Sequence, residues 1–299
     1  MNISFWKHHP ISDQTGEILA AETIEFYNKF KPNFLKITPA GTWIATCYGL
    51  KDYYSGDFLG RRFVECPLIN ELIDWKKIQL FEGTPPPLLE QLKAAEIVCK
   101  EIHDVPVYAT IFSPVTQAIQ LCGLDLFLKH LNENPELIKE VLNTLLLNTN
   151  QIIQRYVELG IEGIYYATQS CQISQLTPEI YSSIGKSIDE SCLEFASNLV
   201  QSVIFHVHGE SIYLNIKEKI PFLCIHYEES TTNSLTTNYP KIIGIPASKI
   251  ETTQDTIEIQ QLVNEYINDA DLILCGCVLP VATEDEIISN WINTIQKMN

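Results

Sequence analysis

Positive charge is scarce in this sequence. Its 20 lysines and arginines face 37 acidic residues, so the formal net charge is −17. Only three residues are arginine: Arg61, Arg62 and Arg155. A field of this sign repels the phosphate backbone of nucleic acids, and it disfavours anionic membrane surfaces for the same reason. We therefore expect neither a nucleic-acid partner nor a membrane partner.

Long apolar segments are also missing. No run approaches the ~18 apolar residues that a membrane span needs, and residues 1–10 lack the apolar core of a secretory signal. The nine cysteines are odd in number and scattered along the chain. Such scattered thiols are typical of a reducing compartment and argue against a disulfide framework. These absences predict a cytoplasmic protein.

Phosphate-binding motifs and repeats are absent as well. The chain has neither GxGxxG nor GxxxxGK[ST], which weighs against nucleotide binding. It contains no internal repeat, low-complexity tract or linker-like segment. We expect one domain over residues 1–299.

What the sequence does contain is an alternation of short apolar runs with amphipathic segments, which is typical of a parallel sheet covered by helices. Strands are predicted at 34–38, 105–112, 161–167, 203–208, 222–227, 241–246 and 271–277. Helices are predicted at 12–31, 85–101, 114–132, 135–159, 177–200, 255–268 and 283–298, with a further short helix ending at 219.

This rhythm and the length of the chain favour an α/β fold of the (β/α)8 barrel type, distorted in places. An open doubly wound sheet is the alternative. Only seven strands are convincing. The eighth is expected within residues 42–84, a stretch rich in aromatics and glycine, unless it is not a regular strand.

Polar side chains collect where three predicted strands end. His206 and His208 end one strand and share a face, because side chains in a strand alternate. His226 and Glu228 end the next strand. The carboxyl ends of barrel strands meet at one rim, which is where such barrels carry their catalytic groups. We therefore expect His226 and Glu228 to be catalytic.

The last predicted strand adds Cys275 and Cys277. Imidazoles and a thiolate are suitable ligands for Zn²⁺. The two cysteines share a face, so periodicity does not choose between them, but Cys277 lies further into the following turn. The pattern predicts a zinc site of His206, His208 and Cys277. The competing interpretation is that the histidines are structural and the cysteines are small apolar core residues.

Four further residues are candidates for binding or catalysis. Lys36 lies within an apolar strand and must meet a carboxylate or a substrate oxygen, because burying an unpaired charge is costly. Lys7 and His8 could bind substrate, or belong to a packing arm. Tyr165 and Tyr166 point to opposite faces, so one of them can line the pocket, and Tyr165 is taken as the candidate.

Four segments carry a resemblance to a known family: 34–41, 113–118, 205–209 and 276–280. In these segments the chain resembles the uroporphyrinogen decarboxylase superfamily, which also includes the methylcobamide:thiol methyltransferases. The resemblance implies a distorted (β/α)8 barrel and makes Gln117 a substrate-binding candidate. In the methyltransferases a His, a Cys and a late Cys hold zinc, which activates a thiol. The matching residues here are His206, His208 in place of cysteine, and Cys277.

The resemblance further implies a small-molecule substrate (a thiol, a corrinoid or a tetrapyrrole-like compound). A corrinoid protein and a second copy of the chain in a homodimer are the candidate partners, and the sequence leaves both open. The decarboxylase branch uses no metal and binds its polycarboxylate substrate with arginines of an N-terminal segment. Residues 5–10 of this chain contain no arginine.

Three hypotheses follow. The first is a zinc-dependent methyl or alkyl transferase that acts on a thiol or a corrinoid-bound methyl group. The second is a metal-independent decarboxylase in which Lys7, Lys36 and a tyrosine hold the substrate's charge. The third is a barrel that binds a corrinoid or another ligand without catalysis.

Overall fold

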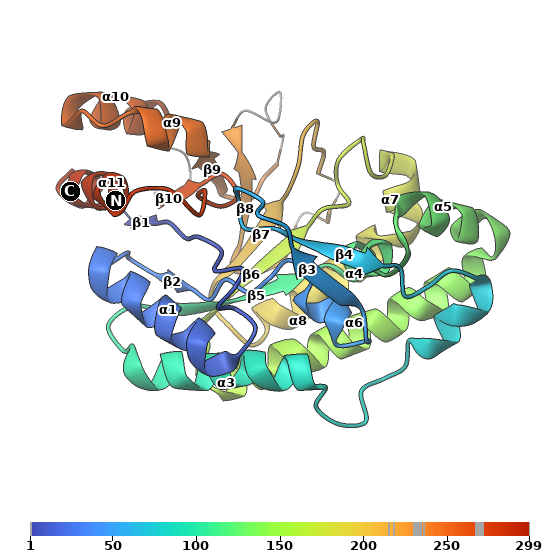
Figure 1. The fold of residues 1–299 in the computed structure, drawn as a ribbon. Helices are drawn as coiled ribbons and strands as arrows, with labels where there is room; N and C mark the ends of the chain where they lie inside the picture. The colour runs from blue at the N-terminus through green and yellow to red at the C-terminus, as the bar shows by residue number, and fades with distance from the viewer. Residues whose placement is uncertain are drawn as a thin grey trace.

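A computed structural model describes residues 2–214, 216–217, 219–229, 235, 237–266 and 272–298. Eight parallel strands form a nearly closed barrel with helices outside it (Figure 1). The strands are β1 (Asn2–Ser4), β2 (Leu35–Lys36), β5 (Val107–Phe112), β6 (Gly163–Thr168), β7 (Val203–Val207), β8 (Leu223–Glu228), β9 (Lys241–Ile245) and β10 (Leu272–Cys275). Their spatial order follows the chain, with β1 beside β10. This order confirms the (β/α)8 prediction, because a doubly wound sheet would reverse direction at a switch point.

The barrel is open at the seam between β1 and β2, which form no ladder. Three hydrogen bonds cross this seam instead. The Asn33 backbone N–H donates to the Ile3 carbonyl at 2.8 Å, and the Ile3 N–H donates to Asn33 Oδ1 at 2.8 Å. Ser4 Oγ donates to the Phe34 carbonyl, also at 2.8 Å. Side-chain bonds thus replace part of the missing ladder and hold the two edges together.

The helices that cover the barrel agree broadly with the prediction, and four of them carry proline in the first turn, where a missing N–H costs nothing. They are α1 (Gly16–Phe30), α2 (Trp43–Thr46), η1 (Leu72–Lys77), α3 (Pro86–Glu101), α4 (Pro114–Cys122), α5 (Leu124–Glu133), α6 (Pro135–Glu158), α7 (Pro178–Ile184), α8 (Lys186–Ser197), α9 (Ala247–Thr252), α10 (Thr256–Tyr266) and α11 (Asp285–Gln296). Within the described part of the chain, no helix is both long and apolar enough to cross a bilayer.

The predicted helix 114–132 is two helices, α4 and α5. Gly123 separates them with a φ of 83°, a conformation that favours glycine and interrupts the helical path. The predicted helix 177–200 is likewise divided, at Gly185. The end of the predicted helix 255–268 and the start of the predicted strand 271–277 lie outside the described residues.

Two predictions in less regular regions are wrong. The eighth strand is β1, not part of 42–84, which instead holds an antiparallel hairpin of β3 (Lys51–Tyr54) and β4 (Arg62–Cys66) outside the barrel sheet. The short helix predicted to end at 219 is absent from the described residues between 208 and 222. Gly209 and Ser211 have φ values of 107° and 51° there, which a right-handed helix does not allow.

The middle strands are buried on both faces, and β6 shows how each face is used. Tyr165 points into the barrel, whereas Tyr166 points outward toward α8. There the Tyr166 hydroxyl donates to Asp189 at 2.7 Å. Ser113 and Tyr181 donate to the same carboxylate at 2.7 and 2.8 Å. We call these four residues (Ser113, Tyr166, Tyr181 and Asp189) the Asp189 cluster.

Candidate metal centre and cavity

A cavity of about 550 Å³ lies at the carboxyl ends of the barrel strands. The barrel contributes Lys36, Tyr165, His206, His208, Glu228 and Cys277 to its wall. The β3–β4 hairpin closes it from the other side with residues 61–64. The position matches the one expected for the functional site of a (β/α)8 barrel.

His206, His208 and Cys277 form a compact group in this cavity. One ligand atom from each residue lies within 4.8 Å of the others. His206 is on β7, His208 is the first residue after it, and Cys277 follows β10. Cys277 Sγ is 3.2 Å from His208 Nδ1. The structure thus brings together the three residues that the sequence selects as metal ligands.

The electrostatics of the group favour a thiolate. Burial alone would raise the pKa of Cys277, but the charge and hydrogen bond of His208, with the charge of Lys36, lower it overall. Cys277 in turn raises the pKa of His208. Cys275 is fully buried, does not line the cavity, and has its pKa raised by burial. Geometry therefore brings Cys277, and not Cys275, to the histidines.

His206 carries an unused nitrogen. Its Nδ1 lies 3.0 Å from Nδ1 of His226, while its Nε2 is buried and has no hydrogen-bond partner within the described part of the chain. The Tyr165 ring stacks on the imidazole, with centroids 5.4 Å apart. Burial, followed by the neighbouring rings of His226 and His208, holds the pKa of His206 well below its usual value. A neutral imidazole with a free lone pair is the form that binds a metal ion.

Lys36 is buried in the wall of the same cavity. Burial lowers its pKa to about 7. Its Nζ donates to Thr38 Oγ1 at 3.3 Å and lies 4.7 Å from the ring centres of Trp6 and Tyr165. No carboxylate of the described residues is within ion-pair distance of it. Within the described residues, Lys36 therefore has no acidic side chain as a structural partner.

The two other predicted catalytic residues lie on β8. Glu228 lines the cavity beside the Cys277 turn: a Cβ added to Gly276 would be only 2.1 Å from Glu228 Oε2. His226 is fully buried behind His206 and is not part of the cavity wall. Burial lowers the pKa of His226 to about 3, against the opposite effect of the Cys275 carbonyl.

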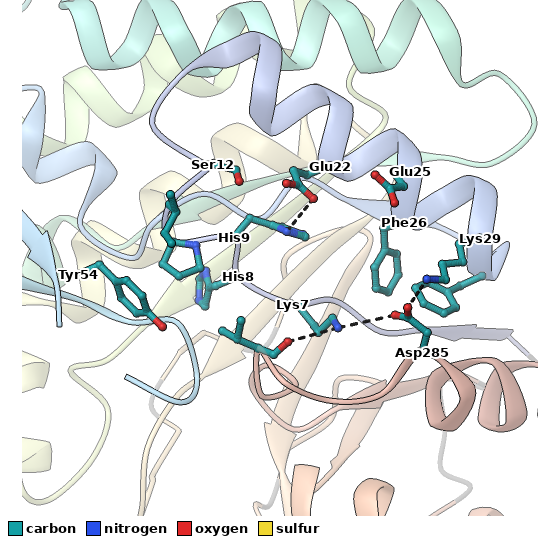
Figure 2. Close-up of a pocket in the computed structure, with 14 residues that line it drawn as sticks. Lys7, His8, His9, Ser12, Glu22, Glu25, Phe26, Lys29, Tyr54 and Asp285 are labelled. Atoms are coloured by element: carbon teal, nitrogen blue, oxygen red, sulfur yellow. Dashed lines mark hydrogen bonds and ion pairs between the residues drawn. The ribbon is translucent and has the colours of Figure 1, made fainter. Parts of the chain in front are cut away.

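Two predicted substrate-binding residues lie away from the cavity. Lys7 Nζ donates to the Thr283 carbonyl at 2.9 Å and is 4.0 Å from Asp285. It lines a second cavity of about 350 Å³ between α1 and the start of α11, shown in Figure 2. Gln117 is buried in α4, where its Nε2 donates to the Phe112 carbonyl at 2.7 Å.

His8 lies between the two cavities and lines both of them. Its Nδ1 is buried without a hydrogen-bond partner. Burial, followed by the charge of Lys36, lowers the pKa of His8 to about 3. His8 is thus a neutral wall residue that faces the main cavity, as Tyr165 does.

Arg61 and Arg62 were missed by the sequence analysis. Both line the main cavity from the hairpin. Arg62 pairs with Asp52 at 2.8 Å, and Arg61 pairs with Asp57 at 2.7 Å. The sequence offered one signal for these two residues: they are adjacent arginines in a chain that contains only one other arginine. Trp6 was also missed, although its Nε1 donates to the Cys277 carbonyl at 2.7 Å and fixes that turn.

Fold and site together define a (β/α)8-barrel protein whose cavity, at the carboxyl ends of the strands, contains a group of three residues that could hold a metal ion. The chain belongs to the uroporphyrinogen decarboxylase (URO-D) family, whose sequence profile matches residues 14–298. Comparison with curated proteins gives no match.

Solved structures of the same fold include a methyltransferase from Methanosarcina mazei. That likeness has a TM-score of 0.72 and 16% identity, and it covers 97% of this chain and 88% of the other. A B12-independent methionine synthase from Shewanella sp. W3-18-1, in complex with selenomethionine, has a TM-score of 0.53 and 10% identity, covering 95% and 88%. At these identities the likeness establishes the fold.

Proposed function

We propose that this protein is a zinc-dependent methyl or alkyl transferase that acts on a thiol or on a corrinoid-bound methyl group. The observation that carries the proposal is the group of His206, His208 and Cys277, whose ligand atoms lie within 4.8 Å of one another in the cavity. The names of two proteins of the same fold, a methyltransferase and a methionine synthase, support this class of reaction.

The residues present fit a zinc ion. Two imidazoles and one thiolate form a donor set that zinc prefers, and three protein ligands leave a fourth position for a substrate. The buried Nε2 of His206 lacks a partner among the described residues, and a bound metal would satisfy it. Zinc, when bound, is a Lewis acid that lowers the pKa of a thiol or water among its ligands.

The other cavity residues would position the reactants. Lys36, which pairs with no carboxylate of the described residues, would hold an oxygen of the substrate. Glu228 would accept the proton that the thiol loses as its sulfur bonds to the methyl carbon. The bond from that carbon to the donor breaks, and its electron pair stays with the donor. The β3–β4 hairpin would exclude bulk water from this exchange.

Metal analysis combined with variants tests the proposal. We expect about one zinc per chain in the wild type, and loss of zinc in Cys277→Ala and His208→Ala. Cys275→Ala is the matched control, because Cys275 is two residues away but lies outside the cavity. Methyl transfer from methylcobalamin to a panel of thiols should follow the zinc content. Wild-type protein that binds no zinc at micromolar concentration would contradict the proposal.

A metal-independent decarboxylase is the second candidate. The family match and the two arginines of the hairpin favour it, because Arg61, Arg62 and Lys36 would bind substrate carboxylates in one cavity. This candidate predicts loss of carbon dioxide from uroporphyrinogen at a rate that a zinc chelator does not change. The transferase predicts no such product.

A further inference from the structure

His206 and His226 form an unusual pair: two imidazoles that face each other through the same ring atom. They occupy paired positions of β7 and β8, and their Nδ1 atoms are 3.0 Å apart. The ring centres are 4.7 Å apart, with an angle of 32° between the planes. His206 lines the cavity, whereas His226 is 0% exposed and lies outside its wall.

Only one proton can lie between the two Nδ1 atoms, so the pair has two arrangements. If His226 donates, a neutral His206 must carry its own proton on Nε2, and that nitrogen then cannot be a metal ligand. If His206 donates, its Nε2 keeps a free lone pair. That Nε2 is buried and has no partner among the described residues, as expected for a lone pair that awaits a ligand.

The far side of His226 favours the second arrangement, in which His226 carries its proton on Nε2. That nitrogen, like Nε2 of His206, forms no hydrogen bond within the described residues, but it and the carbonyl oxygen of Cys275 face the same small space above Gly244. A Cβ added to Gly244 would lie 2.7 Å from the nitrogen and 2.8 Å from the oxygen. A carbonyl accepts a proton and never donates one, so it stabilises the N–H form of the nitrogen that it faces.

Tyr165 completes the arrangement. Its hydroxyl lies 3.0 Å from Nδ1 of His226, and its ring stacks on His206. The hydroxyl can donate to His226, or accept from it, so it does not by itself choose the tautomer. The ring contact limits the tilt of the His206 imidazole. His226 is thus the residue placed to set the tautomer of His206, and the Tyr165 ring is placed to hold the plane of the imidazole.

We propose that His226 is a positioning residue that holds His206 as its Nδ1–H tautomer and directs the Nε2 lone pair of His206 into the candidate metal site. His226 touches neither the cavity nor the reactants, and acts only through His206. The part that concerns metal rests on the proposed zinc function. The tautomer itself is a property of the metal-free protein.

Two measurements on His226→Phe and His226→Gln test the inference. Phenylalanine fills the space among Trp6 and Tyr165 but accepts no hydrogen bond, whereas the glutamine carbonyl can accept one. Competition with a chromophoric chelator should show zinc affinity about 10–100-fold weaker in His226→Phe, the range typical for outer-shell partners. His226→Gln should recover most of the loss.

The second measurement reads the tautomer directly. In metal-free protein with ¹⁵N-labelled histidine, long-range ¹H–¹⁵N correlation should show His206 protonated at Nδ1 in the wild type, and a mixture of tautomers in His226→Phe. Thermal unfolding and circular dichroism check that each variant folds. Tyr165→Phe, which keeps the ring but loses the hydroxyl, should leave the tautomer unchanged.

The outcomes separate the inference from the proposed function. A wild type that shows the Nδ1–H tautomer but binds no zinc overturns the zinc function and the metal part of the inference, and leaves the tautomer part standing. A wild type that binds zinc while His226→Phe has equal affinity and the same His206 tautomer overturns the inference alone. Protonation of wild-type His206 at Nε2 also overturns it.

Discussion

Strand β6 separates two buried polar clusters that differ in one respect. On its outer face, the Asp189 cluster completes its own hydrogen bonds, with three hydroxyl groups donating to one carboxylate. On its inner face, the candidate metal group lines a cavity, and His206 Nε2 has no hydrogen-bond partner among the residues that the structure describes. Tyr165 contacts the inner group, and its neighbour Tyr166 belongs to the outer cluster.

The comparison teaches that burial alone does not mark a functional site. Asp189 and His206 are both enclosed, and both have pKa values moved by burial. A buried polar network that is fully bonded specifies and stabilises the fold. A buried polar atom that lacks a hydrogen-bond partner at the wall of a cavity is available to bind a ligand. The following predictions test this difference, starting with the largest expected effect.

Removal of the Asp189 carboxylate should damage the fold and spare the site. Asp189→Ala leaves three buried hydroxyl groups without their acceptor, so we expect the free energy of unfolding to fall by about 3 kcal/mol. Urea unfolding measures this loss, and zinc affinity at low temperature should stay unchanged. His208→Ala is the converse variant: it should lose zinc with little change in unfolding. Equal destabilisation by both variants would remove the distinction between the clusters.

Removal of the Lys36 charge should do the opposite and stabilise the fold. Lys36→Met keeps a long apolar side chain but no buried charge, so unfolding should cost roughly 1 kcal/mol more near pH 6. Burial lowers the pKa of Lys36 to about 7 from 10.5, so the wild type gains stability as pH rises across that window. The advantage of the variant should therefore shrink between pH 7 and 10.5. Activity should fall. Wild-type turnover in Lys36→Met would exclude a role for Lys36 in substrate binding.

The Asp189 cluster should also give the protein an acid-side pH dependence. Burial raises the pKa of Asp189 to about 6 from 3.8. The folded state therefore binds this proton more tightly, and the resulting stability is greatest below pH 4 and is lost as pH rises to 6. Asp189→Asn cannot titrate, so its unfolding free energy should fall less over that range. An identical pH profile in the variant would show that Asp189 does not titrate there.

The two tyrosines of β6 offer the smallest and best matched comparison. Tyr166→Phe removes one donor from the Asp189 carboxylate and should cost about 1 kcal/mol of unfolding free energy without changing zinc affinity. Tyr165→Phe should cost less than that, because its hydroxyl bonds a nitrogen that has a second partner. Thermal unfolding of both variants, with the wild type as reference, measures the difference. The reverse order would mean that the inner cluster contributes more to stability than the outer one.

The barrel was largely readable from sequence because β5 and β6 are apolar at nearly every position and are separated by long amphipathic segments. β1 was not readable. Its residues, Asn2–Ser4, are too few to show a period, and their structure depends on pairing with Leu272–Leu274. A local sequence pattern does not indicate a pairing strand that lies so far along the chain.

The candidate ligands followed from one rule, that parallel strands end at a common rim, which placed His206, His208 and Cys277 together. The same rule says nothing about a loop that folds back over the barrel, so Arg61 and Arg62 were missed. The rule also gives wrong positions for side chains that bond to nearby backbone and do not reach the cavity. Gln117 bonds the Phe112 carbonyl, five residues earlier, and Lys7 bonds the carbonyl of Thr283.

The pairing of β1 with β10 has a consequence for the order in which the molecule is built. A ribosome releases Ile3 and Trp6 early, but their partners, Ile273 and the Cys277 carbonyl, emerge only some 270 residues later. Contacts of such long sequence separation form late, because their loop-closure entropy must be met first. The turn that carries Cys277 is thus held by the last strand pairing of the barrel. We therefore expect the candidate site to be complete only once β1 has paired with β10.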